Sequence, residues 1–328
     1  MLHVLITGGA GFIGSHTAEA LLARGDRVTV LDAFDFGYDP ALKAENVREA
    51  LAHPGYRLVR GDIRDAALLA HLFTTDRPDV VVHLAARAGV RPSLVDPHSY
   101  IDVNLRGTTT LLEAMRDHGL DRLVFASSSS VYGARGSGTF KESDVVDVPA
   151  SPYAATKRAG ELLTATWHHL YGIQATCLRF FTVYGPRQRP DMAIRIFCER
   201  VRAGEPITMF GDGSSERDYT FVDDIVAGVV SAVDRPLGHC VLNLGNAEPV
   251  RLDTLIRKIG QATGCAPLVT RSGDQPGDVP RTCADVSRAE ALLDYRPTTP
   301  LDVGLRRFVR WLGARTPRPT RPPLAARL

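Results

Sequence analysis

The sequence predicts an α/β fold built on a doubly wound parallel sheet, followed by a smaller C-terminal domain. In the first half of the chain, short apolar segments alternate with segments of helical character. Runs such as Val80-Val81-Val82 are apolar without alternation, which is typical of strands buried on both faces of a parallel sheet. A glycine-rich turn also separates the first apolar run from the first helix, as in Rossmann-type folds.

The individual elements follow in order along the chain. We expect strands at 2–7, 27–32, 56–60, 79–84, 121–127 and 173–180, and helices at 12–24, 40–51, 65–74, 98–118 and 153–171. Beyond about residue 181 this alternation gives way to short elements rich in Gly, Pro and Arg. We therefore expect a nucleotide-binding domain at 1–181, joined by about 216–243, and a mainly substrate-binding domain at 182–314.

Two further segments carry specific expectations. Asp218 to Asp234 has the pattern of a strand and a helix that return to the main sheet. The tail at 315–328 is rich in Pro and Arg, and this composition predicts disorder.

The glycine turn predicts a phosphate-binding site. Val4, Leu5 and Ile6 lead into Gly8, Gly11 and Gly14, and a helical stretch follows. Glycines let the backbone approach a pyrophosphate, and the first amides of the helix face its charge. A second strand ends at Asp32, 18 residues past Gly14. A carboxylate there accepts hydrogen bonds from an adenosine ribose and repels a 2′-phosphate, which favours NAD over NADP.

Composition limits the other functions that the chain can have. A net charge of +2 gives no basis for binding nucleic acid or a membrane surface. The five cysteines are odd in number and form no Cys-x-x-Cys pair, which indicates a reducing compartment and no metal site. No apolar run approaches the ~20 residues that cross a bilayer. We expect a cytoplasmic protein.

The residues Tyr153 and Lys157 stand one helical turn apart and share a face. A nearby cation favours the phenolate form of a tyrosine, whose pKa is otherwise ~10. Only four of the 39 basic residues are lysine, so a lysine at this place is unusual for the chain. Alone, the pair is better explained as two exposed residues on a helix surface; beside the glycine turn it indicates catalysis. The serines at 127–130, which follow a strand, are either backbone caps in a turn or hydroxyls that face the cofactor cleft.

Three motifs together resemble the extended short-chain dehydrogenase/reductase superfamily: GGAGFIG at 8–14, SSSSVYG at 127–133 and YAATK at 153–157. Within it the chain is most similar to the nucleotide-sugar 4-epimerases, and most closely to UDP-glucuronate 4-epimerases. The runs at 85–91 (AARAGVR), 179–186 (RFFTVYGP) and 189–193 (RPDMA) carry that narrower resemblance. The similarity extends from residue 2 to about 312.

The resemblance implies roles for individual residues. Ser128 orders the substrate hydroxyl, Tyr153 is the acid/base, and Lys157 is its electrostatic partner. The implied NAD site consists of Gly8, Gly11, Phe12, Ile13, Gly14, Asp32, Asp62, Ile63, Ala85, Asn104, Tyr153 and Lys157. The implied UDP-sugar site consists of Arg91, Ser128, Ser129, Ser130, Thr182, Arg189, Arg217 and Asp278. No metal is implied.

The implied reaction is a transient oxidation of a UDP-sugar at C4, from UDP-glucuronate to UDP-galacturonate through a 4-keto sugar. Ser130 fills the position at which related decarboxylases and 4,6-dehydratases carry an acid, which counts against both reactions. The run at 210–214 (FGDGS) is more like UDP-glucose epimerases, so a UDP-glucose/UDP-galactose or dual-specificity enzyme stays open. An NAD-binding scaffold without catalysis is the non-enzymatic alternative, and the intact Ser128, Tyr153 and Lys157 count against it.

The superfamily also implies a homodimer, formed by the helices at 98–118 and 153–171 as a four-helix bundle. Both carry apolar residues on two faces: Leu111, Leu112, Met115, Leu162, Leu163, Trp167 and Leu170. The alternative is that one apolar face simply packs on the sheet.

Overall fold

The computed structural model describes residues 1–34, 37–135, 138–273 and 279–315. Its main feature is a seven-stranded sheet in the order β10-β6-β5-β4-β1-β2-β3, in which every pairing is parallel. The strands are β1 (His3–Thr7), β2 (Arg27–Asp32), β3 (Tyr56–Arg60), β4 (Val80–His83), β5 (Arg122–Ser128), β6 (Gln174–Phe180) and β10 (Cys240–Leu244). The carboxyl ends of these strands meet at one edge, where such folds bind ligands.

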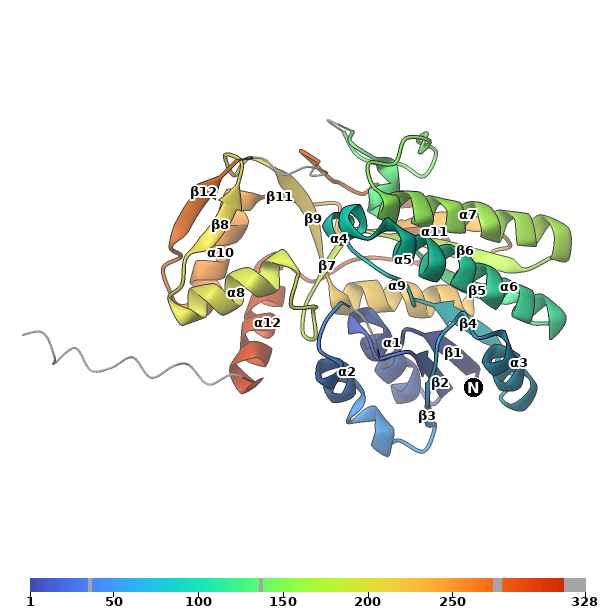
Figure 1. Cartoon of the computed structure of the whole chain (residues 1–328). Helices are drawn as coiled ribbons and strands as arrows, with labels where there is room; N and C mark the ends of the chain where they lie inside the picture. The colour runs from blue at the N-terminus through green and yellow to red at the C-terminus, as the bar shows by residue number, and fades with distance from the viewer. Residues whose placement is uncertain (35–36, 136–137, 274–278, 316–328) are drawn as a thin grey trace, which may run out of the picture.

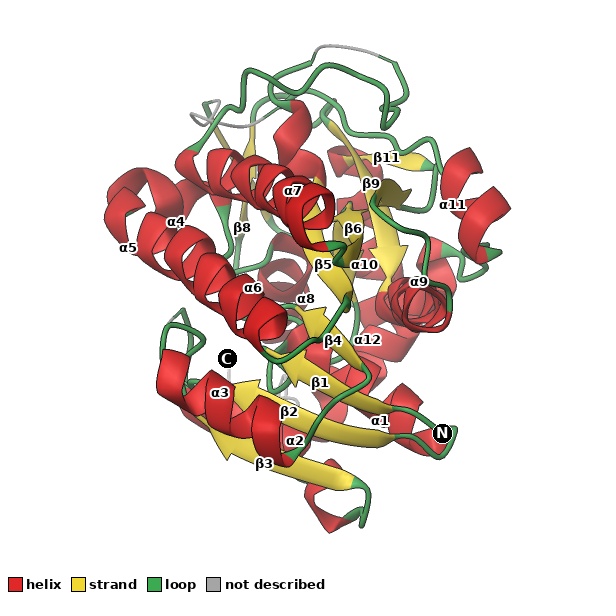
Figure 2. Cartoon of the chain, turned by 90° about the vertical axis from the view of Figure 1, so that its right-hand side faces the viewer, coloured by secondary structure: helices red, strands yellow, loops and turns green. Residues whose placement is uncertain are grey.

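Helices cover both faces of this sheet, as Figure 2 shows. One face carries α3 (Ala66–Thr75), α6 (Gly107–Asp117) and α7 (Pro152–Tyr171); the other carries α1 (Phe12–Ala23) and α9 (Val222–Asp234). Side chains of a strand alternate between the faces, so β1 contributes to two separate cores. Val4 and Ile6 belong to the core shared with α1 and α9, whereas Leu5 belongs to the core beneath α3 and α6.

Most of the elements after residue 181 form a smaller part, which lies beside the main sheet in Figure 1. Strands β7 (Thr182–Tyr184), β9 (Glu216–Phe221) and β11 (Pro249–Arg251) make a three-stranded sheet, and β8 (Ile207–Phe210) pairs with β12 (Val269–Ser272). Its helices are α8 (Ala193–Ala203), α10 (Leu252–Thr263) and α12 (Leu301–Arg315), whereas α11 (Ser287–Leu293) packs against α9 and β10 of the main sheet. The core of this part is continuous with the α1–α9 side of the main sheet.

Two expected helices are interrupted. The helix expected at 40–51 is α2 (Pro40–Val47) and a short 3₁₀ turn, η1 (Ala50–Ala52). The helix expected at 98–118 consists of α5 (Pro97–Ile101), a π turn η2 (Asp102–Arg106) and α6, with a separate short helix, α4 (Val90–Val95), before it. A π turn adds one residue to a helical turn and is frequent at functional sites. Here it contains Asn104, whose side chain holds the backbone of Arg87.

The expected return of residues 218–234 to the main sheet is wrong for the strand. Strand β9 pairs with β7 and β11 in the second sheet, because β10, further along the chain, occupies the edge beside β6. Helix α9 does return to cover the main sheet. Helix α12 ends at Arg315, so the rest of the predicted tail lies outside the described residues. Among the described residues, none of the helices has the length and apolar character to cross a membrane.

Candidate active site

A cavity of about 650 Å³ opens at the carboxyl edge of the main sheet. It begins at the glycine turn after β1, passes the ends of β4 and β5, and reaches the segment at 180–192. Most of the residues predicted for the two ligands line this single cavity: Gly8, Gly11, Phe12, Ile13, Gly14, Asp32, Asp62, Ile63, Ala85, Ser128, Ser129, Ser130, Tyr153, Lys157, Thr182 and Arg189. A volume of this size suits an extended ligand.

The glycine turn is packed so closely that side chains have no room. A Cβ at Gly14 would lie 2.4 Å from the carbonyl oxygen of Gly8, and one at Gly8 would lie 2.7 Å from the backbone nitrogen of Ala85. Gly8 also has a φ of 72°, in the left-handed region that favours glycine. Gly11 is the N-cap of α1 and has no side chain to occupy the space before the helix. The amides at the start of α1 therefore face the cavity without obstruction, as binding of a pyrophosphate requires.

Asp32 ends β2 and is almost fully buried. Its carboxylate accepts hydrogen bonds from the backbone amides of Ala10 (3.1 Å) and Phe34 (2.9 Å). It also forms an ion pair with Lys43 of α2, with 2.8 Å between Nζ and Oδ1. These contacts fix the carboxylate at the cavity wall, where a ribose with free hydroxyls can bind to it. The sequence did not single out Lys43 for this site, although Lys43 also lines the cavity.

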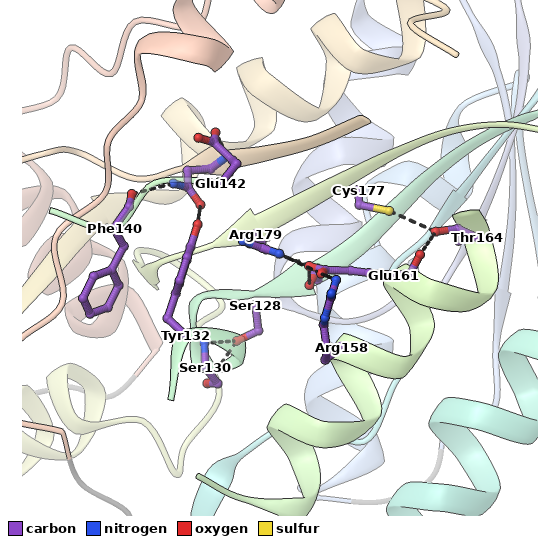
Figure 3. A network of polar contacts seen from close by, with 12 residues as sticks. Ser128, Ser130, Tyr132, Phe140, Glu142, Arg158, Glu161, Thr164, Cys177 and Arg179 are labelled. Carbon is purple, nitrogen blue, oxygen red and sulfur yellow. Dashed lines mark hydrogen bonds and ion pairs between the residues drawn. The ribbon is translucent and has the colours of Figure 1, made fainter. Parts of the chain in front are cut away.

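Ser128, Tyr153 and Lys157 come together from β5 and α7. Ser128 is the N-cap of a 3₁₀ turn, η3 (Ser129–Tyr132), and its hydroxyl donates to the hydroxyl of Ser130 at 3.1 Å (Figure 3). Helix α7 begins with Ser151 as its N-cap, so Tyr153 lies in its first turn. One turn later the Lys157 ammonium donates to the carbonyl oxygen of Ala126 at 2.7 Å. The carbonyl thus orients the ammonium beside the end of β5.

Burial shifts the pKa of both catalytic candidates on α7. It raises the pKa of Tyr153 above its usual 10, although hydrogen bonding with Ser128 and the positive charge of Arg189 act in the opposite direction. Burial also lowers the pKa of Lys157 to about 8. The tyrosine therefore holds its proton at neutral pH in the ligand-free protein. The spacing of Tyr153 and Lys157 along the helix indicates the neighbouring cation but not this cost of burying a phenolate.

Arg189 is engaged within the protein. Its Nε and Nη2 bind the carboxylate of Asp191 at 3.0 and 2.5 Å, and Nη2 also donates to the carbonyl oxygen of Ala88 at 3.1 Å. The same carbonyl accepts a hydrogen bond from the hydroxyl of Tyr100, whose ring packs edge-on against Tyr153 with 6.2 Å between the centroids. Arg189 and the reactive tyrosine are therefore linked through one loop.

Four predicted residues are not at the cavity wall or are not described. The side-chain amide of Asn104 accepts a hydrogen bond from the backbone nitrogen of Arg87 at 2.7 Å and donates one to the backbone oxygen of Arg87 at 2.9 Å. It also donates to the hydroxyl of Thr156. Arg91 lies over the ring of Phe210. Arg217 on β9 donates to the carbonyl of Glu216. Asp278 lies outside the described residues. Roles in binding for these four stay predictions.

A buried chain of hydrogen bonds beneath the cofactor region was not predicted. Thr7 contacts His83 Nδ1 at 2.7 Å, and His83 Nε2 contacts Thr108 at 3.0 Å. Because the Thr108 hydroxyl donates to the carbonyl of Asn104, it accepts from Nε2, and Nδ1 accepts from Thr7. Burial and, to a smaller extent, the positive charge of Lys157 lower the pKa of His83 to about 3, so the ring is neutral. His83 is a single histidine within an apolar strand, and nothing in the sequence around it indicated this series of hydrogen bonds.

One cavity at the edge of a parallel sheet thus contains a glycine turn, a carboxylate placed to bind a ribose, and the side chains of a serine, a tyrosine and a lysine. This combination defines a nucleotide-dependent oxidoreductase or isomerase. Comparison with known proteins narrows the class. The family model described as "NAD dependent epimerase/dehydratase family" matches residues 4–245, and the chain belongs to that family.

Individual relatives cover nearly the whole chain. A UDP-glucuronate 4-epimerase of Thermodesulfobacterium geofontis is 41% identical over 312 residues, 95% of this chain and 96% of the relative. The crystal structure of UDP-glucuronic acid 4-epimerase from Bacillus cereus, in complex with UDP-glucuronic acid and NAD, matches with a TM-score of 0.91 at 36% identity, covering 96% and 100%. A Thermus thermophilus UDP-glucose 4-epimerase with NAD matches with a TM-score of 0.86 at 36% identity, covering 95% and 100%.

The described residues fit NAD, the cofactor of this family. The glycine turn leaves the space that a Cβ would fill, and Asp32 presents a fixed carboxylate at the cavity wall. When bound, NAD supplies a hydride acceptor that can return the hydride later in the same cycle.

Proposed function

We propose that the chain is a UDP-glucuronate 4-epimerase, which interconverts UDP-glucuronate and UDP-galacturonate through a 4-keto sugar. The observation that carries this proposal is the single cavity that joins the glycine turn to Ser128, Tyr153 and Lys157 and then to the hydroxyls of Ser129, Ser130 and Thr182. The cavity therefore connects the region expected to bind the cofactor with the region expected to bind the sugar. An enzyme whose cofactor stays bound through the reaction requires such a connection, because hydride passes between the two within one cavity.

The chain's residues divide the proton transfer at the sugar O4. Tyr153 accepts the O4 proton as hydride leaves C4, and it returns a proton when hydride adds to the other face. Because burial raises the pKa of Tyr153 even with the positive charge of Arg189 nearby, formation of the phenolate requires further positive charge. Lys157, held on the carbonyl of Ala126, supplies one such charge. Ser128 holds the sugar hydroxyl at the end of β5.

The sugar carboxylate is the group that separates a uronate from a neutral hexose. In the 4-keto form, this carboxylate is β to the ketone and can leave as CO₂. Ser129, Ser130 and Thr182 line the cavity with neutral hydroxyls that can donate hydrogen bonds to it. A serine at position 130, rather than an acid, avoids a second negative charge at this place.

One observation favours the alternative, a UDP-glucose 4-epimerase or a dual-specificity enzyme. Arg189, which the resemblance places in the UDP-sugar site near the hydroxyls proposed to bind the carboxylate, is paired with Asp191 in the structure. A uronate would therefore have to compete with this internal carboxylate. The Thermus UDP-glucose 4-epimerase also has the same identity to the chain as the Bacillus enzyme.

A product analysis tests these proposals. The purified protein is incubated with UDP-glucuronate and, separately, with UDP-glucose, and the products are resolved by chromatography. We expect UDP-galacturonate to form faster than UDP-galactose; the reverse ranking would support the alternative, and a UDP-pentose would indicate decarboxylation. In parallel, Tyr153→Phe should abolish turnover and retain NAD, because the phenol ring stays in place while the proton acceptor is lost.

We also infer a cytoplasmic homodimer. All five cysteines are free thiols, which supports a reducing compartment. Leu111, Leu112 and Met115 are buried against the sheet, but other apolar side chains of the same helical layer are exposed: Leu94, Val95, Ile101, Leu162, Leu170 and Tyr171. An exposed apolar layer of this kind is typical of an interface between subunits. Light scattering coupled to size-exclusion chromatography tests the dimer, and a monomer at micromolar concentration would contradict it.

A further inference from the structure

A buried ion pair lies directly beneath the candidate catalytic residues. Glu161 of α7 and Arg179 of β6 have side chains only 1% and 2% exposed. The Arg179 Nε and Nη2 atoms each bind one carboxylate oxygen at 2.8 Å, which is a bidentate geometry. The same carboxylate accepts from the hydroxyl of Ser127 at 2.6 Å and from Arg158 at 3.1 Å. Figure 3 shows Arg158 and Arg179 converging on it.

The position of Glu161 on α7 connects it with the chemistry. Tyr153, Lys157 and Glu161 are spaced four residues apart, so they follow one face of the helix over successive turns. Lys157 binds the carbonyl of Ala126, and Glu161 binds the side chain of the next residue, Ser127. Helix α7 is therefore attached to β5 at two consecutive residues, immediately before Ser128.

Arg179 extends the same attachment to the other end of the Ser128 turn. It lies opposite Ser127 in the register of β5 and β6. Its guanidinium stacks over the ring of Tyr132, 4.8 Å from the centroid, and the Tyr132 hydroxyl donates to Asn243 of β10 at 2.7 Å. Tyr132 is the last residue of η3, the turn that Ser128 caps. The ion pair thus holds both ends of this turn against α7.

Stability alone is a weak explanation for such a pair. The free energy needed to remove two charges from water offsets much of the free energy gained from their attraction. Replacing such a pair by apolar side chains of similar volume is therefore often neutral or stabilising. The Arg179 Nη1 atom is also buried without a hydrogen-bond partner in the described structure, which adds to that cost. A pair retained at this cost, at the junction of three active-site elements, fits a role in geometry.

We propose that the Glu161–Arg179 pair is a positioning element that sets the place of Ser128 on β5 relative to Tyr153 and Lys157 on α7. This inference rests on the proposed function, because it assumes that these three residues act on one substrate hydroxyl. A displacement of about 1 Å between reacting groups can lower a rate by about 100-fold. Loss of the pair should therefore reduce kcat, while the cofactor and nucleotide regions keep their affinity.

The test is the double variant Glu161→Leu/Arg179→Met, which replaces the buried pair by apolar side chains. Arg158 also loses the Glu161 carboxylate, but its side chain is 28% exposed and its charge can be solvated. We expect a thermal midpoint close to that of the parent, bound NAD unchanged, KM within about threefold, and kcat lower by about 100-fold. Formation of reduced nicotinamide, followed at 340 nm after mixing with the UDP-sugar, should slow by the same factor. A parent-like kcat in a folded double variant would overturn the proposal.

Arg179→Lys provides a second measurement, which is needed if the double variant does not fold. It keeps the positive charge but loses the two-pronged geometry. Positioning predicts a fall in kcat of about 10-fold or more without loss of NAD, whereas a role in charge balance alone predicts a parent-like kcat.

Arg24→Met is the matched control. It removes an ion pair with Asp26, itself 5% exposed, just beyond the end of α1 that is farthest from the glycine turn. This control should lower the thermal midpoint and leave kcat unchanged. A parent that epimerises no UDP-sugar would refute the proposed function, whereas an active parent with an equally active double variant would refute only the positioning role.

Discussion

The glycine turn makes a quantitative prediction for Gly14→Ala. The new Cβ would lie 2.4 Å from the Gly8 carbonyl oxygen and 2.7 Å from the Gly9 Cα, and neither backbone atom can rotate away. The turn must open by about 1 Å, and overpacking of this kind costs about 1–3 kcal/mol. Alanine offsets up to about 1 kcal/mol of this by its higher helix propensity. The NAD-free protein should therefore lose about 1–2 kcal/mol of unfolding free energy.

The same opening would move the first amides of α1 away from the place where a pyrophosphate is expected to bind. One hydrogen bond to a charged group contributes about 1.5–3 kcal/mol, so its loss should weaken NAD binding by 10-fold or more. The thermal unfolding midpoint of the NAD-free protein should fall by about 2–3 °C, given an unfolding entropy of about 2.1 cal/mol/K per residue. Calorimetry measures both the midpoint and the affinity.

Gly313→Ala is the matched control for this prediction. Gly313 lies in α12, and a Cβ there meets only the Arg202 Nη2 atom, at 3.8 Å. The same chemical change should therefore stabilise the protein by up to about 1 kcal/mol and leave NAD affinity unchanged. The steric argument is refuted if Gly14→Ala matches the parent in both midpoint and affinity.

Three further predictions concern buried charges. Lys157→Met should stabilise the NAD-free protein at pH 7 by at most about 3 kcal/mol, because burial lowers the folded-state pKa of Lys157 to about 8 from 10.5. The folded state binds fewer protons than the unfolded state between these values, so the gap in denaturation midpoints between variant and parent should be constant below pH 8 and close toward pH 10.5; a widening gap would contradict this. Asp218→Asn should cost about 2–4 kcal/mol in chemical denaturation, because the buried carboxylate accepts from three backbone amides and an amide group cannot accept at every site; a parent-like midpoint would contradict it. Asp32→Asn should raise NADP affinity relative to NAD by 10-fold or more, because the repulsion of a 2′-phosphate is lost while Lys43 remains; an unchanged ratio in titration calorimetry would refute the assignment of Asp32.

The strands of the main sheet could be predicted because their signal is local. Most are short apolar runs bounded by turn residues, and six of the seven lie within a residue of the expected limits; β10 was not predicted. The pairing of β9 could not be predicted in this way. Its partners β7 and β11 are distant in sequence, and only the assembled fold determines which strand takes the free edge of β6.

The site shows the same division between local and assembled features. Asp32, Tyr153 and Lys157 follow motifs of fixed spacing, so the sequence placed them at the cavity. His83 and Glu161 did not stand out, because each acts through partners from other strands or helices. The raised pKa of Tyr153 likewise depends on burial, which spacing along a helix cannot report.

The order of strands in the main sheet has a consequence for synthesis of the chain. Strand β6 ends at residue 180, but β10, which covers its outer edge, begins only at residue 240. At 5–20 residues per second, a ribosome needs about 3–12 s to make the intervening segment. During that time the nascent chain presents an apolar strand edge with unpaired amides and carbonyls, which is a template for aggregation. A fragment that ends at residue 181 would keep this open edge permanently, so the nucleotide-binding part should need the later residues to remain monodisperse.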